Sequence, residues 1–299
     1  MNRRTFLFKT SGLSLSIFCA PASAQAPAKK VSDRIAMGTV LFRYRFKQTK
    51  PKEIADLKNE LTLVAVPGYY RERFGIRNLE FWSNHFDSLE RGYLEKLKAS
   101  IAAANARLVN VQIDSSYDLA SKKEEERVRS IAHVKEWMDA VSFLESTCIR
   151  INPGRGGGLI EECIKSMREV NDYAKSKKLI LLTENHFGIE MNPDLHLRIV
   201  KEAGDDNIYT LPDFGNYPQE TRFEALAKIL PKAYFISAKA SDFNADMEHV
   251  SFDFDKCVKL AEQLGFKGIY SVEQWSPKYQ DIDYEKVGDW MIEHVRKNI

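Results

Sequence analysis

The chain has 299 residues, 44 basic and 42 acidic side chains, and a formal net charge of +2. That length suits one large barrel or two ordinary domains. The near-neutral charge offers no basic surface for nucleic acid, so no nucleic-acid partner is expected. The four cysteines are not closely paired along the chain and do not indicate a disulfide framework.

Residues 1–24 have the features of a twin-arginine (Tat) signal peptide. Arg3-Arg4 precedes a short apolar run, and residues 22–24 (Ala-Ser-Ala) form a small-residue cleavage site. The run is too short to be a stable membrane anchor, so the sequence predicts a periplasmic or secreted protein. Removing Arg3, Arg4 and Lys9 changes the formal charge from +2 to −1. Residues 25–32 form a polar linker.

From residue 33 onward the chain alternates strand-like and helix-like segments. Strand starts lie roughly 25 to 40 residues apart, the length of a strand plus one crossover helix. Residues 124–145 and 159–177 carry apolar side chains at steps of three and four, as helices do. We therefore predict a single (β/α)8 TIM barrel over residues 33–299. An open doubly wound sheet is the alternative, but no GxGxxG follows the first strand. The predicted strands are 35–42, 77–82, 107–114, 148–152, 179–184, 207–213, 233–239 and 268–273.

Alternation along these strands places polar side chains inside the barrel. In residues 107–114, Val109, Val111 and Ile113 share the face expected to pack on helices. A polar interior is unfavourable unless its groups pair with one another, with a metal or with a ligand. The pattern therefore predicts a binding site inside the barrel. The residues predicted to face inward are Asn110, Gln112, Asp114, Arg150, Asn152, Ser237, Lys239, Ser271 and Glu273.

The carboxyl ends of the strands carry ionisable and aromatic residues. Such ends meet at one face of a barrel, where active sites lie. Three carboxylates there, Glu184, Asp213 and Glu273, repel one another unless a proton or a cation intervenes. Hard oxygen ligands suit Mg²⁺ or Mn²⁺. The other candidates at these ends are Glu80, Trp82, His85, His186, Asn216, Ser237, Lys239 and Trp275.

Six motifs, in this order and spacing, carry a resemblance to a known family: GIRNLEFW, IRINPG, LTENHFG, LPDFGNYP, ISAKASDF and YSVEQW. From about the second strand onward the chain resembles the xylose isomerase-like TIM barrel superfamily, which includes the sugar phosphate isomerase/epimerase family. The resemblance implies a divalent cation, Mn²⁺ or Mg²⁺, held by Glu184, Asp213 and Glu273. Ser237 stands where the family usually has a histidine ligand. Two alternatives stay open: the carboxylates hold a cation without that histidine, or Lys239 neutralises them and no metal binds.

The resemblance also implies a sugar isomerase or epimerase. Glu184 and Glu273 would remove and return a proton next to a carbonyl group. The residues expected to bind a carbohydrate substrate are Glu80, His85, His186, Asn216, Lys239 and Trp275. Export favours an unphosphorylated sugar or sugar derivative. The alternatives are a keto-sugar lyase or dehydratase, a 3-keto-glycoside hydrolase on the same site, or a non-catalytic sugar-binding barrel.

Overall fold

The computed structural model describes residues 31–54, 59–114, 116–154, 157–204, 206–276 and 279–299. The predicted signal peptide, residues 1–24, lies outside the described residues, so export stays a prediction. No helix in the described part of the chain has the length and apolar character needed to cross a membrane.

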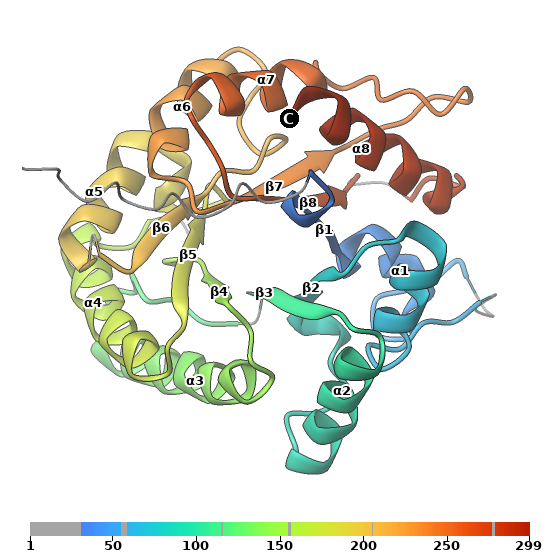
Figure 1. Ribbon diagram of the computed structural model, residues 1–299. Helices are drawn as coiled ribbons and strands as arrows, with labels where there is room; N and C mark the ends of the chain where they lie inside the picture. The colour runs from blue at the N-terminus through green and yellow to red at the C-terminus, as the bar shows by residue number, and fades with distance from the viewer. Residues whose placement is uncertain (1–30, 55–58, 115, 155–156, 205, 277–278) are drawn as a thin grey trace, which may run out of the picture.

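Eight parallel strands form the barrel, which confirms the predicted fold class (Figure 1). Hydrogen-bonded neighbours run in the order β6-β5-β4-β3-β2-β1-β8-β7. Two isolated parallel bridges, Thr210–Ala233 and Asp213–Ser237, join β6 to β7. The strands are β1 (Ile35–Gly38), β2 (Asn78–Trp82), β3 (Arg107–Ile113), β4 (Cys148–Ile151), β5 (Ile180–Glu184), β6 (Ile208–Leu211), β7 (Phe235–Ala240) and β8 (Ile269–Gln274).

The α-helices surround the strands as an outer ring (Figure 1). They are α1 (Val66–Phe74), α2 (Arg91–Ala103), α3 (Glu124–Phe143), α4 (Ile160–Ser176), α5 (Pro193–Gly204), α6 (Arg222–Ile229), α7 (Phe254–Gln263) and α8 (Tyr284–Asn298). Short 3₁₀ helices are η1 (Val31–Arg34), η2 (Thr39–Arg45), η3 (Ser83–His85), η4 (Ile189–Met191) and η5 (Leu230–Lys232).

The first strand is shorter than predicted. It ends at Gly38, and residues 39–45 form η2 instead of continuing the strand to residue 42. A Cβ atom at Gly38 would lie 3.2 Å from Glu80 Oε2, so glycine permits a close approach between β1 and β2. The turn places η2 over the carboxyl ends of β2 and β8, the strands that it contacts most.

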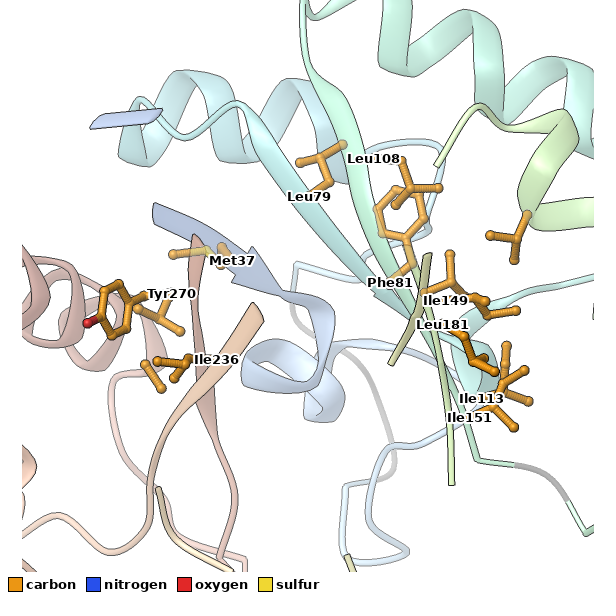
Figure 2. Packing of buried hydrophobic residues seen from close by; sticks show 14 of the residues in the cluster. Met37, Leu79, Phe81, Leu108, Ile113, Ile149, Ile151, Leu181, Ile236 and Tyr270 are labelled. Carbon is orange, nitrogen blue, oxygen red and sulfur yellow. The ribbon is translucent and has the colours of Figure 1, made fainter. Parts of the chain in front are cut away.

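The main hydrophobic core lies between the strands and the helices (Figure 2). Met37, Leu79, Ile149, Ile236 and Tyr270 project from five different strands into it and have no exposed surface. Burial of an aliphatic side chain of this size contributes about 1.5–3 kcal/mol. Because this face of the sheet is apolar, the polar residues of the same strands face the barrel interior, as alternation predicted.

A β-bulge makes Val109 an exception to that prediction. Leu79 pairs with Leu108, but the next residue, Glu80, pairs with Asn110, so Val109 is an extra residue on β3. The side chain of Val109 lies with an inner apolar cluster instead of sharing the face of Val111. The other buried members of that cluster are Ala36, Cys148, Leu182, Leu211 and Phe235.

Candidate active site

A cavity of about 610 Å³ lies at the carboxyl ends of the strands. In TIM barrels this is the end at which active sites lie. The volume falls within the range of about 300–1,000 Å³ that is usual for small-molecule sites. Its lining is Val40, Trp82, Gln112, Ile113, Asp114, Tyr117, Arg150, Asn152, Gly154, Glu184, His186, Phe187, Lys239, Glu273 and Trp275.

Two cations from opposite parts of the barrel stand among the carboxylates. Arg150, on β4, lies with Nη1 2.5 Å from Asp114 Oδ1 and with Nε 3.1 Å from Glu184 Oε2. Lys239, on β7, places Nζ 3.2 Å from Asp213 Oδ2. Lys239 Nζ also donates a hydrogen bond to Asn216 Oδ1. Negative and positive groups therefore alternate around the base of the cavity.

The turn after β6 orients Asp213 and Asn216. The backbone N–H groups of Gly215 and Asn216 donate to Asp213 Oδ1 at 2.7 and 2.9 Å. Asn216 Nδ2 then donates to Glu184 Oε1 at 3.2 Å, which links β5 to this turn. A Cβ atom at Gly215 would lie 2.9 Å from Lys239 Cε, so the glycine leaves room for the lysine.

Burial and charge shift the pKa values of these groups in different directions. Burial raises the pKa of Glu184 well above its usual range and raises that of Glu273 to about 7. Burial also acts to raise the pKa of Asp114, but the neighbouring guanidinium of Arg150 outweighs it and lowers the value to about 2. Burial acts to lower the pKa of Lys239, but Asp213, Glu273 and Glu184 raise it overall. The ammonium therefore stays charged.

Most of the predicted site residues come together here. Glu184, His186, Lys239, Glu273 and Trp275 line the cavity. Three more are next to it without lining it: Asp213 contacts Lys239, Asn216 contacts both Lys239 and Glu184, and Ser237 pairs with Asp213 across the β6–β7 bridge. Glu80 also lies outside the lining. It is buried and accepts a hydrogen bond from Asn110 Nδ2 at 2.6 Å.

The structure does not bring His85 into the cavity. Its ring is fully buried, stacks on Phe46 at a centroid distance of 3.7 Å, and contacts Thr39 Oγ1 and Thr49 Oγ1, both at 2.9 Å. Burial, and secondarily the charge of Arg43, lowers the pKa of His85 to about 3. His85 therefore attaches η2 and the segment after it to the end of β2, as a neutral imidazole.

We expect a change from pH 7 to pH 5 to be less unfavourable for the stability of the His85→Gln variant than for that of the wild type. The folded pKa of His85 is about 3, below its ordinary 6.5, so the unfolded state takes up the proton first. The stability due to neutral His85 is complete above pH 6.5 and is lost as pH falls toward 3. At pH 5 the loss is about 2 kcal/mol for this one group. Urea unfolding of both proteins at both pH values measures this difference, and an equal change in the free energy of unfolding of the two proteins would contradict the assignment.

The sequence-based site omitted Arg150, Asp114 and Gln112. Gln112 Nε2 donates to Glu273 Oε2 at 3.2 Å, and Arg150 Nη2 donates to Gln112 Oε1 at 3.3 Å. Together with the ion pair between Arg150 and Glu184, these bonds connect Glu184 and Glu273 through β3 and β4. The signal for all three residues was strand alternation, which placed them inside the barrel without showing their partners.

The donor set does not fit a resident divalent cation. Ser237 offers no nitrogen ligand, and Arg150 and Lys239 already lie 3.1 and 3.2 Å from oxygens of Glu184 and Asp213. A divalent ion between these carboxylates would be repelled by both cations. Within the described ranges, no three His, Cys, Asp or Glu side chains are grouped so that they could hold a metal ion. The predicted three-carboxylate metal site is therefore not present in that form.

The fold is a single-domain TIM barrel with a cavity lined by ionisable side chains at the carboxyl ends of its strands. Residues 71–296 match the family model described as xylose isomerase-like TIM barrel, and the chain belongs to this family. None of the curated proteins matches the sequence significantly.

Solved structures show the same fold at low sequence identity. An L-ribulose 3-epimerase has a TM-score of 0.68 and 14% identity, over 89% of this chain and 95% of the other. A xylose isomerase-like protein from Mycobacterium smegmatis, in complex with magnesium, has a TM-score of 0.63 and 16% identity, over 89% and 97%. The 3-keto-D-glucoside 4-epimerase of E. coli has a TM-score of 0.62 and 13% identity, over 86% and 98%.

Proposed function

We propose that this protein is a sugar isomerase or epimerase that moves a proton next to the carbonyl group of an unphosphorylated sugar or sugar derivative. The observation that carries the proposal is the pair Glu184 and Glu273. Both line one cavity, from strands β5 and β8, and burial raises the pKa of both. Carboxyl groups with raised pKa values can act as acid and base near neutral pH. The epimerases among the structures of similar fold support the substrate class.

In this proposal, one carboxylate takes the proton from carbon and the other carboxyl group returns one to the opposite face. Removal of the proton places negative charge on the substrate carbonyl oxygen. Lys239 and Arg150 line the same cavity and supply positive charge for that oxygen. Since the donor set does not fit a divalent cation, these two side chains take the electrophilic role that was expected of Mn²⁺ or Mg²⁺.

Trp82 and Trp275 form an aromatic wall of the cavity. Their ring centroids lie 6.0 Å apart at 85°, and Trp82 Nε1 donates to Asp114 Oδ2 at 2.8 Å. An aromatic face suits the apolar C–H face of a sugar ring, while the neighbouring Asp114 and His186 can bind hydroxyl groups. The wall would orient the substrate between Glu184 and Glu273.

Deuterium exchange tests the proposal directly. Protein treated with a chelator is incubated in D₂O with a panel of ketopentoses, ketohexoses and 3-keto derivatives of glucose and its glycosides. We expect NMR to show deuterium at the carbon next to the carbonyl group of at least one substrate, at a rate that added Mn²⁺ or Mg²⁺ does not raise. Absence of exchange across the panel would refute the proposed function. Exchange that requires added metal would instead refute the roles of Lys239 and Arg150.

A further inference from the structure

A second cavity adjoins the candidate active site on its outer side. It measures about 650 Å³ and shares Trp82 and Trp275 with the first cavity. The two tryptophans therefore stand between an inner space with the ionisable groups and an outer space without Glu184 or Glu273. The lining of this outer cleft is Arg43, Tyr44, Thr49, Pro51, Glu53, Trp82, Trp275, Ser276 and Tyr279.

A buried arginine fixes one wall of the outer cleft. The guanidinium carbon of Arg43 lies 4.1 Å from the ring centroid of Tyr44 and 4.7 Å from that of Trp275. Arg43 is 3% exposed; its Nη1 donates to the carbonyl oxygen of Gln274 at 2.6 Å, and its Nη2 donates to Tyr44 Oη at 2.7 Å. The cation thus holds Tyr44 and Trp275 in place through both hydrogen bonds and cation–π contacts.

Tyr279 extends this aromatic surface. Its ring lies 4.9 Å from that of Tyr44, nearly perpendicular to it, and its side chain is 40% exposed. Trp275 is similarly exposed, at 39%. Exposed aromatic side chains gathered in a cleft, with Thr49, Glu53 and Ser276 beside them, combine apolar area with hydroxyl and carboxylate groups. That combination suits the ring of a sugar or of an aryl group.

We propose that the outer cleft binds the glycosidic substituent of the substrate, so that the protein acts on keto-glycosides in preference to free keto-sugars. The inference rests on the proposed function, because it places the reacting sugar ring in the inner cavity. A single ring between Glu184 and Glu273 leaves the outer cleft empty. A second ring attached to it reaches Tyr44 and Tyr279 past the shared tryptophans. The substrate class is therefore a keto-glycoside with a cyclic substituent. Its anomeric carbon is held in the acetal, so the carbonyl group next to the transferred proton lies on another carbon of the reacting ring.

Calorimetric binding tests this assignment independently of turnover. The probes are the 3-keto derivatives of glucose, galactose and xylose, each as the free sugar, the methyl glycoside and the phenyl glycoside. We expect at least one phenyl glycoside to bind about tenfold more tightly than its free sugar, a difference of about 1.4 kcal/mol. The methyl glycoside should bind like the free sugar. If no phenyl glycoside binds more tightly than its free sugar, the proposal is overturned.

Variants at Tyr279 complete the test. Tyr279→Ala should remove the tenfold preference for the phenyl glycoside, and Tyr279→Phe, which keeps the ring, should retain it. The matched control is Tyr234→Ala, because Tyr234 is 38% exposed but lines a different cavity, together with Arg107 and Lys267. An unchanged preference in Tyr279→Ala, or an equal loss in the control, would overturn the proposal.

Failure of this inference is distinguishable from failure of the proposed function. Deuterium exchange on free sugars with no glycoside preference would overturn the outer cleft and leave the proposed function standing. A glycoside preference that depends on Tyr279, without any proton exchange, would support the cleft and refute the isomerase or epimerase.

Discussion

Replacement of Glu273 by glutamine should reduce the rate of deuterium exchange by about 10²–10⁴-fold, the usual contribution of a positioned acid or base. Glutamine keeps the shape of the side chain, and its amide oxygen can still accept the hydrogen bond from Gln112 Nε2. Lys239 keeps its ion pair with Asp213. The variant therefore removes the titratable group and leaves the cavity in place.

The same change should raise the free energy of unfolding at pH 8. Burial raises the folded pKa of Glu273 from 4.5 to about 7, so its charged form is disfavoured in the folded state. The resulting destabilisation develops as pH rises from 4.5 to 7 and is complete above that range. Glutamine carries no charge, so the variant does not suffer this destabilisation. A gain in stability together with a loss of exchange would separate a chemical role from simple misfolding.

Glu262→Gln is the matched control, and its expected change in stability has the opposite sign. Glu262 lies on α7 and pairs with Arg34 at 2.6 Å, before the start of β1 and therefore at the other end of the barrel. We expect this variant to lower stability and to leave deuterium exchange unchanged. Equal exchange rates in Glu273→Gln and the wild type would refute the role of Glu273.

Replacement of Arg150 by methionine should lower the free energy of unfolding by about 3–5 kcal/mol, the usual cost of removing one partner from a buried ion pair. Arg150 is 2% exposed and pairs with both Asp114 and Glu184. Methionine fills part of the volume but leaves the buried carboxyl group of Glu184 and the partly exposed one of Asp114 without their cation. Urea unfolding at pH 7 measures the loss.

The loss in free energy of unfolding caused by Arg150→Met should be smaller at acidic pH. With Arg150 present, the pKa of Asp114 is about 2, below its ordinary 3.8. The stability from this ion pair is therefore complete above pH 3.8 and disappears as pH falls through 2. The difference between wild type and Arg150→Met should accordingly be largest near neutral pH.

Arg198→Met provides the comparison. Arg198 also bridges two glutamates, Glu161 and Glu202, at 2.6 and 2.8 Å, but its side chain is 37% exposed. Exposed pairs contribute roughly 0–1 kcal/mol because water and salt screen them. If Arg150→Met costs no more than Arg198→Met, the internal ion pairs do not hold the site together.

Strand alternation made the fold and much of the site predictable. Each of the eight predicted strands has its counterpart, and the polar faces point inward because the opposite faces are apolar enough to pack on helices. Val109 was misplaced because a bulge adds one residue to β3, and nothing in the local pattern of alternating side chains marks that residue. At the end of β1, Gly38 approaches Glu80 closely, and these two residues are distant in the sequence.

The partners of the inward-facing residues could not be predicted in the same way. Alternation shows that Arg150 faces the interior, but its contacts with Asp114 and Glu184 depend on the relative heights of three strands. His85 follows a strand end just as His186 does, yet one ring packs on Phe46 and the other lines the cavity. The pKa shifts follow from these placements, so they too required the structure.

The junction between β6 and β7 is the loosest part of the barrel wall. It is held by isolated bridges, whereas β7 and β8 pair continuously over six residues. Pro212 contributes to the gap because it has no N–H to donate, although its carbonyl oxygen accepts from Ser237 N at 3.1 Å. Local opening of the barrel should therefore begin between β6 and β7, and this opening would separate Asp213 from Lys239. A bound substrate that contacts Lys239 and Glu184 together would link β7 to β5 and so stabilise the β6–β7 junction. Amide hydrogen exchange at Phe214 and Ser237 should then be slower.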